Sequence, residues 1–193
     1  MRNAFCIVLA LAPMAAAAPA LKGGVDGRYY ATRLGAKWIY DADGKEYTHI
    51  VTKVEDADGG KIIFIGKEEG GKITPVRKLT ISDKGVFQDQ DGDEKLDPPF
   101  CYLKLPAKVG DTWEANLSHQ GKIMGRGTRT MAGVEEIEVP AGKFRAVRVD
   151  WDYTPTGQPT YKVMTWYAPG VGMVKMLSGK LTTVLQKFSP GKD

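Results

Sequence analysis

The sequence is poor in the side chains that most often cross-link a fold or carry out catalysis. It contains two cysteines and two histidines among 193 residues. Cys6 lies in an N-terminal apolar run that we expect to be removed, so the mature chain keeps one thiol, Cys101. A single thiol excludes an internal disulfide framework. The fold must therefore be held by its own core, and a chain of this length can bury one.

Recognisable catalytic motifs are also missing. The chain has no Gly-x-Ser-x-Gly elbow, no His-Glu-x-x-His pair and no phosphate-binding glycine loop. Cys101 stands among apolar neighbours, with no adjacent basic residue or histidine to lower its pKa. We therefore interpret it as a buried, inert thiol and not as a nucleophile.

Neither long apolar runs nor a charge of one sign dominates the sequence. Its formal net charge is +4, with lysines and acidic residues interspersed. This distribution lacks the basic stripe of a nucleic-acid-binding protein. No stretch approaches the ~20 apolar residues that a membrane-spanning helix needs. We also find no segment with apolar residues at helical spacing and proper caps.

The N-terminus has the layout of a secretory signal peptide. Arg2 gives a positive start, Phe5 to Ala12 form an apolar run, and residues 14–18 supply small side chains for cleavage. We predict a signal peptide over residues 1–18 and one domain over residues 19–193. The protein is then exported, to the periplasm or out of the cell.

The remaining chain reads as strands separated by turns. Asp43-Gly44 favours a tight hairpin turn. The strand that follows, Tyr47 to Val54, is expected to place Ile50, Thr52 and Val54 on one face. Between Phe144 and Tyr153, hydrophobic and charged residues alternate, which is typical of a half-buried antiparallel strand. We predict an all-β protein, a single antiparallel meander of about 10–13 short strands curved into a half-closed barrel.

The two halves of the chain resemble each other. Gly35 to Trp38 corresponds to Gly110 to Trp113, among other short matches. A duplication with units at residues 27–90 and 103–189 fits these matches. Chance similarity between two meanders explains them as well, and both interpretations stay open.

An acidic segment between the predicted strands could bind calcium. Its carboxylates have the spacing of the first ligands of a calcium loop, and we take them as candidate metal ligands: Asp89, Asp91, Asp93 and Asp97. The segment departs from the helix–loop–helix pattern, with Glu94 in place of a glycine and Phe100 in place of a bidentate glutamate. The alternative is a solvated acidic turn, part of a polar break over residues 89–99.

Other polar residues could form a catalytic site only if the fold gathers them. Asp150 and Asp152 share one face of a strand, and His49 lies in another strand. The second histidine, His119, lies at a predicted turn. We expect surface or structural roles for these groups. The four tryptophans are interpreted first as core residues, with the lining of a ligand cavity as the alternative.

Several motifs resemble those of a known group of proteins. They are Leu105-Pro106 with Val109 to Trp113, Val139 to Phe144, and Trp166 to Gly172. Together they resemble a broad family of exported bacterial proteins of unknown function. More remotely, the chain is similar to the periplasmic lipoprotein carriers of the LolA/LolB type, whose curved sheet holds lipid acyl chains. Unlike the carriers, it has no segment that predicts a helix.

These observations favour one class of function and leave two others open. We expect an exported, non-catalytic envelope protein that binds an apolar ligand, a lipid or a partner protein through its sheet. The first alternative is a hydrolase-type enzyme with a carboxylate and histidine site. The second is a structural module stabilised by calcium. No cofactor is expected apart from that calcium.

Overall fold

The computed structural model describes residues 28–192. The predicted signal peptide, residues 1–18, lies outside this range. The described chain contains thirteen β-strands and no helix. Accordingly, no helix in this range could cross a membrane. The predicted all-β fold class is confirmed.

The strands follow one another as antiparallel hairpins. The first six are β1 (Lys37–Ala42), β2 (Lys45–Ala57), β3 (Gly60–Glu69), β4 (Lys72–Ser82), β5 (Gly85–Asp91) and β6 (Glu94–Lys104). The other seven are β7 (Thr112–Glu114), β8 (Leu117–His119), β9 (Lys122–Val139), β10 (Gly142–Pro155), β11 (Tyr161–Ala168), β12 (Gly172–Ser178) and β13 (Leu181–Ser189).

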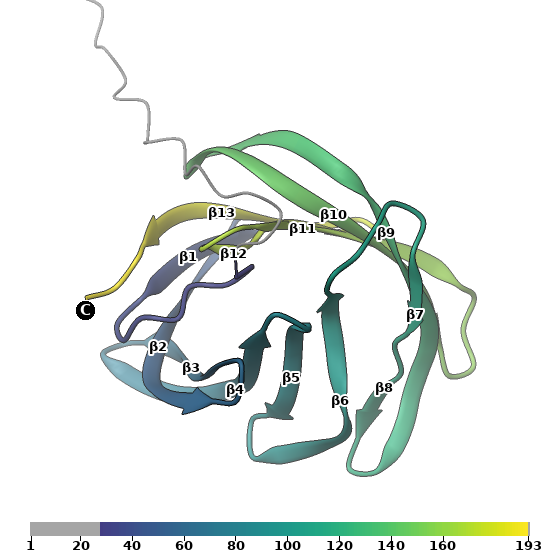
Figure 1. Ribbon diagram of the computed structural model, residues 1–193, viewed down its shortest axis with the longest axis horizontal. Helices are drawn as coiled ribbons and strands as arrows, with labels where there is room; N and C mark the ends of the chain where they lie inside the picture. Colours follow the sequence, from purple (N-terminus) through teal and green to yellow (C-terminus); the bar gives the residue numbers. More distant parts are fainter. Residues whose placement is uncertain (1–27, 193) are drawn as a thin grey trace, which may run out of the picture.

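All thirteen strands belong to one sheet that is almost closed into a barrel (Figure 1). Its order is β6-β5-β4-β3-β2-β1-β13-β12-β11-β10-β9-β7, and β8 also pairs with β9. The first strand therefore pairs with the last, and the free edges are β6 on one side and β7 with β8 on the other. The gap between these edges is the seam of the barrel. The predicted half-closed meander is confirmed.

The first hairpin turn forms as its sequence predicts. Asp43 and Gly44 both have positive φ, 50° and 85°, which the tight turn between β1 and β2 requires. The Asp43 carboxylate accepts a hydrogen bond from the Thr182 amide at 3.0 Å, and the Asp43 amide donates to the Thr182 carbonyl at 3.2 Å. The turn is thus tied to the start of β13, where the chain closes the barrel.

The predicted polar break at residues 89–99 is wrong, because this segment forms the hairpin of β5 and β6. Gln90 pairs with Lys95 and Asp91 with Glu94. A register shift after Gln88 leaves residues 96–99 outside the ladder, and these include Pro98 and Pro99. Prolines cannot donate to a ladder, so they are tolerated here on an edge strand with an irregular register.

The inner face of the barrel follows the predicted alternation in β10 but not in β2. In β10 the predicted face is buried throughout, comprising Val147, Val149, Trp151 and Tyr153. In β2 the inward residues are Tyr47, His49 and Val51, not Ile50 and Thr52. A register shift between Val51 and Lys53 then reverses the alternation, so Val54 packs against the core while Thr52 is exposed. The prediction that Ile50, Thr52 and Val54 share one face is therefore wrong.

Residues 28–36, which precede β1, fill part of the barrel interior without forming a strand. Tyr29, Tyr30 and Ala31 are buried. The Tyr30 ring lies 5.3 Å from that of Trp38, and Gly170 donates a backbone hydrogen bond to Arg28 at 2.7 Å. Figure 1 shows this segment inside the ring of strands. The core is therefore completed by a segment that carries no strand pattern.

The far ends of β9 and β10 form an arm that covers part of the outer face. The arm arches over β11 to β13 in Figure 1, and at its turn Ala141 donates to the Leu185 carbonyl at 3.1 Å. Trp166 lies on the outer face, opposite Arg148 in the ladder, and is only 6% exposed. Its indole donates to Glu135 of the arm at 2.9 Å. The arm therefore contributes to the burial of this tryptophan, which also belongs to the main hydrophobic cluster.

Candidate functional site

The seam is joined by side chains and not by a backbone ladder. Across it, the Trp113 indole donates to the Cys101 carbonyl at 3.2 Å, and Arg129 Nη1 donates to the Tyr102 carbonyl at 2.9 Å. Farther along, Glu94 accepts a hydrogen bond from the Gln120 amide, and its Oε2 lies 2.7 Å from Nδ1 of His119. No strand pair of the described chain bridges the seam, which is closed by these contacts and by the packing of Leu96 and Phe100 of β6 against Trp151 of β10.

Arg129 is a buried cation beside the seam. It lies on β9 between Trp113 of β7 and Trp151 of β10, and it is 4% exposed. Its guanidinium carbon lies 4.8 Å from the ring centres of both Phe100 and Trp151, and 5.6 Å from that of Tyr102. Aromatic faces stabilise a cation, more so when it is removed from water. No carboxylate of residues 28–192 forms an ion pair with Arg129.

Two hydrogen-bond donors in this cluster have no acceptor within the described chain. They are Nε of Arg129 and Nε1 of Trp151, both buried. A buried donor without a partner costs about 1–3 kcal/mol, and more when it carries charge. The two residues stand directly opposite each other on β9 and β10. The site therefore offers two unused N–H groups, one of them cationic, within an aromatic cluster.

Two glycines of β9 make room for the aromatic rings of this cluster. A Cβ on Gly127 would lie 2.5 Å from Nε1 of Trp151, and a Cβ on Gly125 would lie 2.4 Å from the Tyr153 ring. The rings of Trp151 and Tyr153 are 4.2 Å apart. Gly125 and Gly127 lie inside β9 and not in a turn. They are packing positions that admit the rings.

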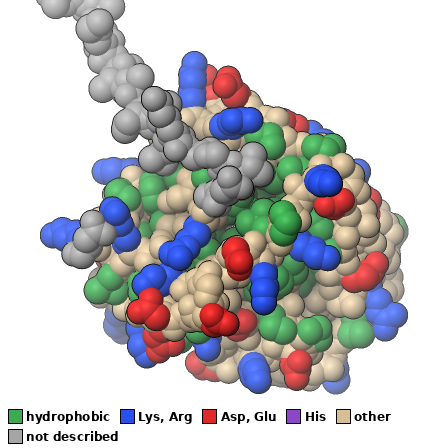
Figure 2. Space-filling view, viewed as in Figure 1, with side chains coloured by type: hydrophobic (Ala, Val, Ile, Leu, Met, Phe, Trp, Pro, Cys, Tyr) green, Lys and Arg blue, Asp and Glu red, His purple; other side chains and the backbone are tan. Residues whose placement is uncertain are grey.

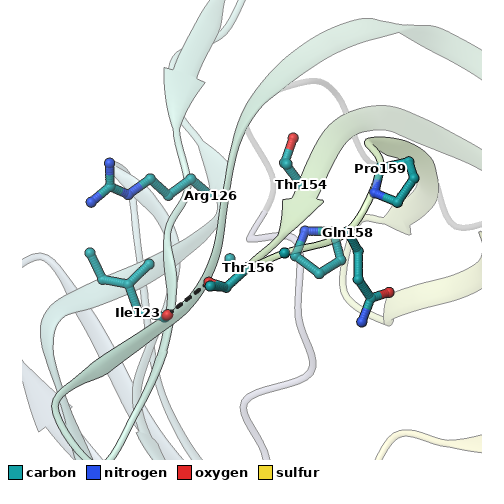
Figure 3. A pocket seen from close by; sticks show the side chains of 9 residues that line it. Ile123, Arg126, Thr154, Thr156, Gln158 and Pro159 are labelled. Atoms are coloured by element: carbon teal, nitrogen blue, oxygen red, sulfur yellow. Dashed lines mark hydrogen bonds between the residues drawn. The ribbon is translucent and has the colours of Figure 1, made fainter.

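A surface groove of about 660 Å³ lies at the ends of the β8–β9 and β10–β11 hairpins. Figure 3 shows the residues that line it, with Thr156 donating to the Ile123 carbonyl at 3.0 Å. Gly125 lines the groove and also lies against Tyr153. A series of contacts thus leads from the groove through Tyr153 and Trp151 to Arg129. We refer to Arg129, Trp151, Tyr153, Phe100 and Tyr102 as the seam cluster.

The barrel interior beyond the seam cluster is also polar. Tyr102 donates a hydrogen bond to the Gln88 side chain. The Tyr167 hydroxyl accepts a hydrogen bond from Arg129, and burial raises the pKa of this tyrosine. Half-buried Arg77 lies opposite Asp91 and acts electrostatically on Tyr102 and Tyr30. Most of these neighbours are phenols. Arg129 is therefore surrounded by aromatic and phenolic groups and not by counter-ions.

His49 lies on the inner face, away from any carboxylate partner in the described chain. It is 8% exposed and packs edge-on against Tyr47 and Tyr40, at 5.0 and 6.0 Å between ring centres. Burial, together with the positive charges of Arg77 and Lys67, lowers its pKa from 6.5 to about 4. The imidazole is neutral at physiological pH and has a structural role in the core.

The predicted carboxylate pair lies on the outside of the barrel. Asp150 binds Arg148 at 2.9 Å and lies 3.7 Å from Lys162, and Asp152 lies 3.5 Å from the same lysine. Asp150 and Asp152 thus lie in ion pairs on the outer face while His49 faces inward, so the fold does not gather them. Acidic and basic groups are likewise interspersed on the face shown in Figure 2.

The four candidate metal ligands are distributed along the β5–β6 hairpin. Asp89 accepts a hydrogen bond from Thr80 at 2.7 Å, and Asp91 takes part in the strand pair. Among residues 28–192 no three acidic, histidine or cysteine side chains are grouped closely enough to hold a metal ion. Calcium binding by Asp89, Asp91, Asp93 and Asp97 stays a prediction. Cys101 is partly buried, and burial raises its pKa to about 11, in accord with an inert thiol.

Comparisons with known proteins support the family resemblance and the fold. Residues 105–178, which include β7 to β12, match the DUF3108-like family. The resemblance to a broad family of exported proteins of unknown function is confirmed. No curated protein matches the chain at a significant level.

Two crystal structures share the fold at low sequence identity. One is a candidate exported protein with a YmcC-like fold from Bacteroides fragilis, with a TM-score of 0.58 and 16% identity. The other is a candidate lipoprotein from Parabacteroides distasonis, with a TM-score of 0.56 and 16% identity. Each comparison covers 84% of this chain and 99% of the other. They establish a shared fold, while the similarity to the lipoprotein carriers stays a prediction.

Replacement of Gly127 should disrupt the seam cluster. In Gly127→Ala the new Cβ would meet the Asp152 carbonyl oxygen at 2.2 Å as well as the Trp151 indole, so we expect a loss of about 1–3 kcal/mol of unfolding free energy. Gly133→Ala is the matched control on the same strand, because nothing lies within 4 Å of its Cβ position. It should be neutral or slightly stabilising. Urea denaturation measures both, and equal midpoints would contradict the packing role of Gly127.

His49 should make stability dependent on pH. Its pKa is lower in the folded state than in the unfolded state, so the unfolded state binds more protons between pH 6.5 and 4. The neutral His49 therefore contributes fully to the free energy of unfolding above pH 6.5, and this contribution is lost as the pH falls to 4. Each unit of pKa is worth about 1.4 kcal/mol, so the loss amounts to about 3 kcal/mol. His49→Gln should remove this part of the pH dependence, while His119→Gln at the exposed histidine should retain it. Identical pH profiles for wild type and His49→Gln would refute the assignment.

The effect of calcium on stability tests the acidic hairpin directly. A ligand that binds the native state raises its melting temperature. Since the carboxylates do not converge, we expect the same melting temperature in millimolar calcium and in a chelator. A rise that Asp91→Asn and Asp93→Asn abolish would instead establish the predicted metal site.

Proposed function

We propose that this protein is an exported, non-catalytic envelope protein that binds a molecule with an apolar chain at the seam cluster. The observation that carries the proposal is the seam itself, where a nearly closed sheet is joined by side chains directly over a group of aromatic residues. A small, mostly apolar site with a few polar groups is the usual form of a ligand site. Export is supported by the predicted signal peptide and by the family resemblance.

The surroundings of the seam cluster suit an apolar chain. Besides its aromatic rings, the cluster is lined by aliphatic side chains from three strands, Leu96 of β6, Val163 of β11 and the partly buried Met176 of β12. The groove next to Gly125 gives the outer end of such a chain a place to leave the protein. Parting of the seam would admit the chain, because only side-chain contacts need to separate. Binding would then replace those contacts with new apolar ones.

A second candidate function is that of a scaffold for a partner protein. The hairpin of β8 and β9 exposes three large apolar side chains, Leu117, Ile123 and Met124, between 37% and 47%. Neighbouring exposed apolar residues favour protein contact when they form a patch. The hydrolase alternative has less support, since Asp150 and Asp152 lie in outer ion pairs and His49 lies in the interior.

Native mass spectrometry and tryptophan fluorescence together test the binding function. We expect the mature chain, purified gently from its own envelope fraction, to carry an added mass in the range of an amphiphile. After delipidation, 1-dodecanol and laurate should each change the fluorescence of the wild type. The change should be lost in Trp151→Phe and retained in Trp166→Phe, because Trp166 lies on the outer face. A bare mass, with no fluorescence change for either compound, would refute the binding function and favour the scaffold.

A further inference from the structure

The two unused donors of the seam cluster specify which chemical group they would bind. One belongs to a guanidinium, whose Nη1 is already engaged by the Tyr102 carbonyl. The other belongs to an indole, which can only donate. An acceptor that satisfies both must offer two oxygen atoms, or one oxygen with two free lone pairs.

The relative positions of these donors favour one shared acceptor. Trp151 stands opposite Arg129 in the β9–β10 ladder, and its ring centre lies 4.8 Å from the guanidinium carbon. Its Nε1 lies above Gly127, two residues before Arg129 and on the same face of β9. The indole N–H therefore occupies the place that a side chain at Gly127 would take, where the Asp152 carbonyl oxygen also lies. An acceptor between the two unused donors would bridge β9 and β10.

The charge at this site favours an anionic acceptor over a neutral one. Arg129 is buried, and no acidic group of the described chain pairs with it. Hydrogen bonds between a guanidinium and an oxyanion are stronger than those to a neutral oxygen, and the fork of N–H groups matches two oxygens at once. An oxyanion would also neutralise a cation that the fold leaves without a counter-ion.

From this arrangement we infer that Arg129 and Trp151 bind the oxyanion head group, carboxylate or phosphate, of an amphiphile whose apolar chain lies in the seam cluster. The inference rests on the proposed function, because it names the head group of the same ligand. Nε of Arg129 and Nε1 of Trp151 donate to the head group. The chain contacts Phe100 and Val163 and leaves toward the groove at Gly125.

Calorimetric titration of the delipidated protein separates the head group from the chain. The probes are laurate, dodecyl phosphate and 1-dodecanol, which share a chain length, together with acetate and inorganic phosphate, which lack the chain. We expect laurate or dodecyl phosphate to bind at least about tenfold more tightly than dodecanol, the effect of one charged hydrogen bond. Acetate and inorganic phosphate should not bind measurably. Saturable binding of either would refute the requirement for a chain.

Substitutions then assign the head group to the two donors. Trp151→Phe removes one N–H and keeps most of the ring. It should therefore lower the affinity for laurate by about tenfold and leave the affinity for dodecanol almost unchanged. Arg129→Met should abolish the preference for the anion, provided that its circular dichroism and melting curve show a folded protein. Arg145→Met, at an exposed arginine of the arm, is the control and should bind like the wild type.

The outcomes distinguish this inference from the proposed function. If dodecanol binds as tightly as laurate and Trp151→Phe changes neither, the head-group assignment is overturned while the apolar site remains. If none of the three long-chain probes binds, the proposed function itself fails. A preference for the anion that Trp151→Phe and Arg129→Met both remove, and that Arg145→Met keeps, supports the complete proposal.

Discussion

Pairing of the first strand with the last is the constraint on which this structure depends. β1 and β13 form a ladder along most of their length, with Trp38 opposite Phe188 and Tyr40 opposite Leu185. The Trp38 indole donates to the Val171 carbonyl at 2.8 Å, which fixes the closure to the turn before β12. Because the first and last strands of the chain meet here, the free edges of the sheet come from the middle of the chain. Residues 105–111 connect them, so the edges cannot move far apart.

Free strand edges must be protected from pairing with other chains, and the seam does so without a ladder. β6 carries Pro98 and Pro99 and an irregular register, and β7 and β8 contain three residues each. Both features prevent a regular pairing between the edges. The protection comes from Trp113 and Arg129, which reach across to backbone carbonyls of β6. Arg129 therefore both protects the strand edge and gives the seam cluster its polar character.

The sequence predicts the fold where local patterns decide it. The alternation in β10 and the Asp43-Gly44 turn are local features, and both have the predicted structure. The patterns fail where the ladder is irregular. In β2 the inward residues are Tyr47, His49 and Val51, and a register shift after Val51 reverses the alternation. The sequence pattern does not show this shift. The prolines of β6 led to the prediction of a break between strands. A strand tolerates them only at the edge of a sheet, and which strand lies at the edge is defined by the topology and not by the local sequence.

The seam cluster could have been found only in part. One face of β9 carries a charged residue among small and apolar ones, at every second position: Gly125, Gly127, Arg129 and Met131. This charge on an otherwise apolar face could have been detected in the sequence. The sequence could not show that Phe100 and Trp151, from β6 and β10, stack on that charge. Nor could it show that Asp150 and Asp152 lie on the opposite face from His49. These relations depend on the closure of the barrel, which brings together strands that are distant in sequence.

Arg129 is a buried charge that no ion pair within the described chain balances. Replacement of a buried ionic group by an apolar one of similar volume is often neutral or stabilising. Stacking on Phe100 and Trp151 recovers part of the desolvation energy of the guanidinium, but it gives no acceptor to Nε of Arg129 or Nε1 of Trp151. The hydrogen bond across the seam accounts for one N–H group of Arg129. A neutral donor could form such a bond, as the Trp113 indole does. The proposed ligand with an oxyanion would satisfy the remaining two donors and the charge together, which no contact within the described chain does.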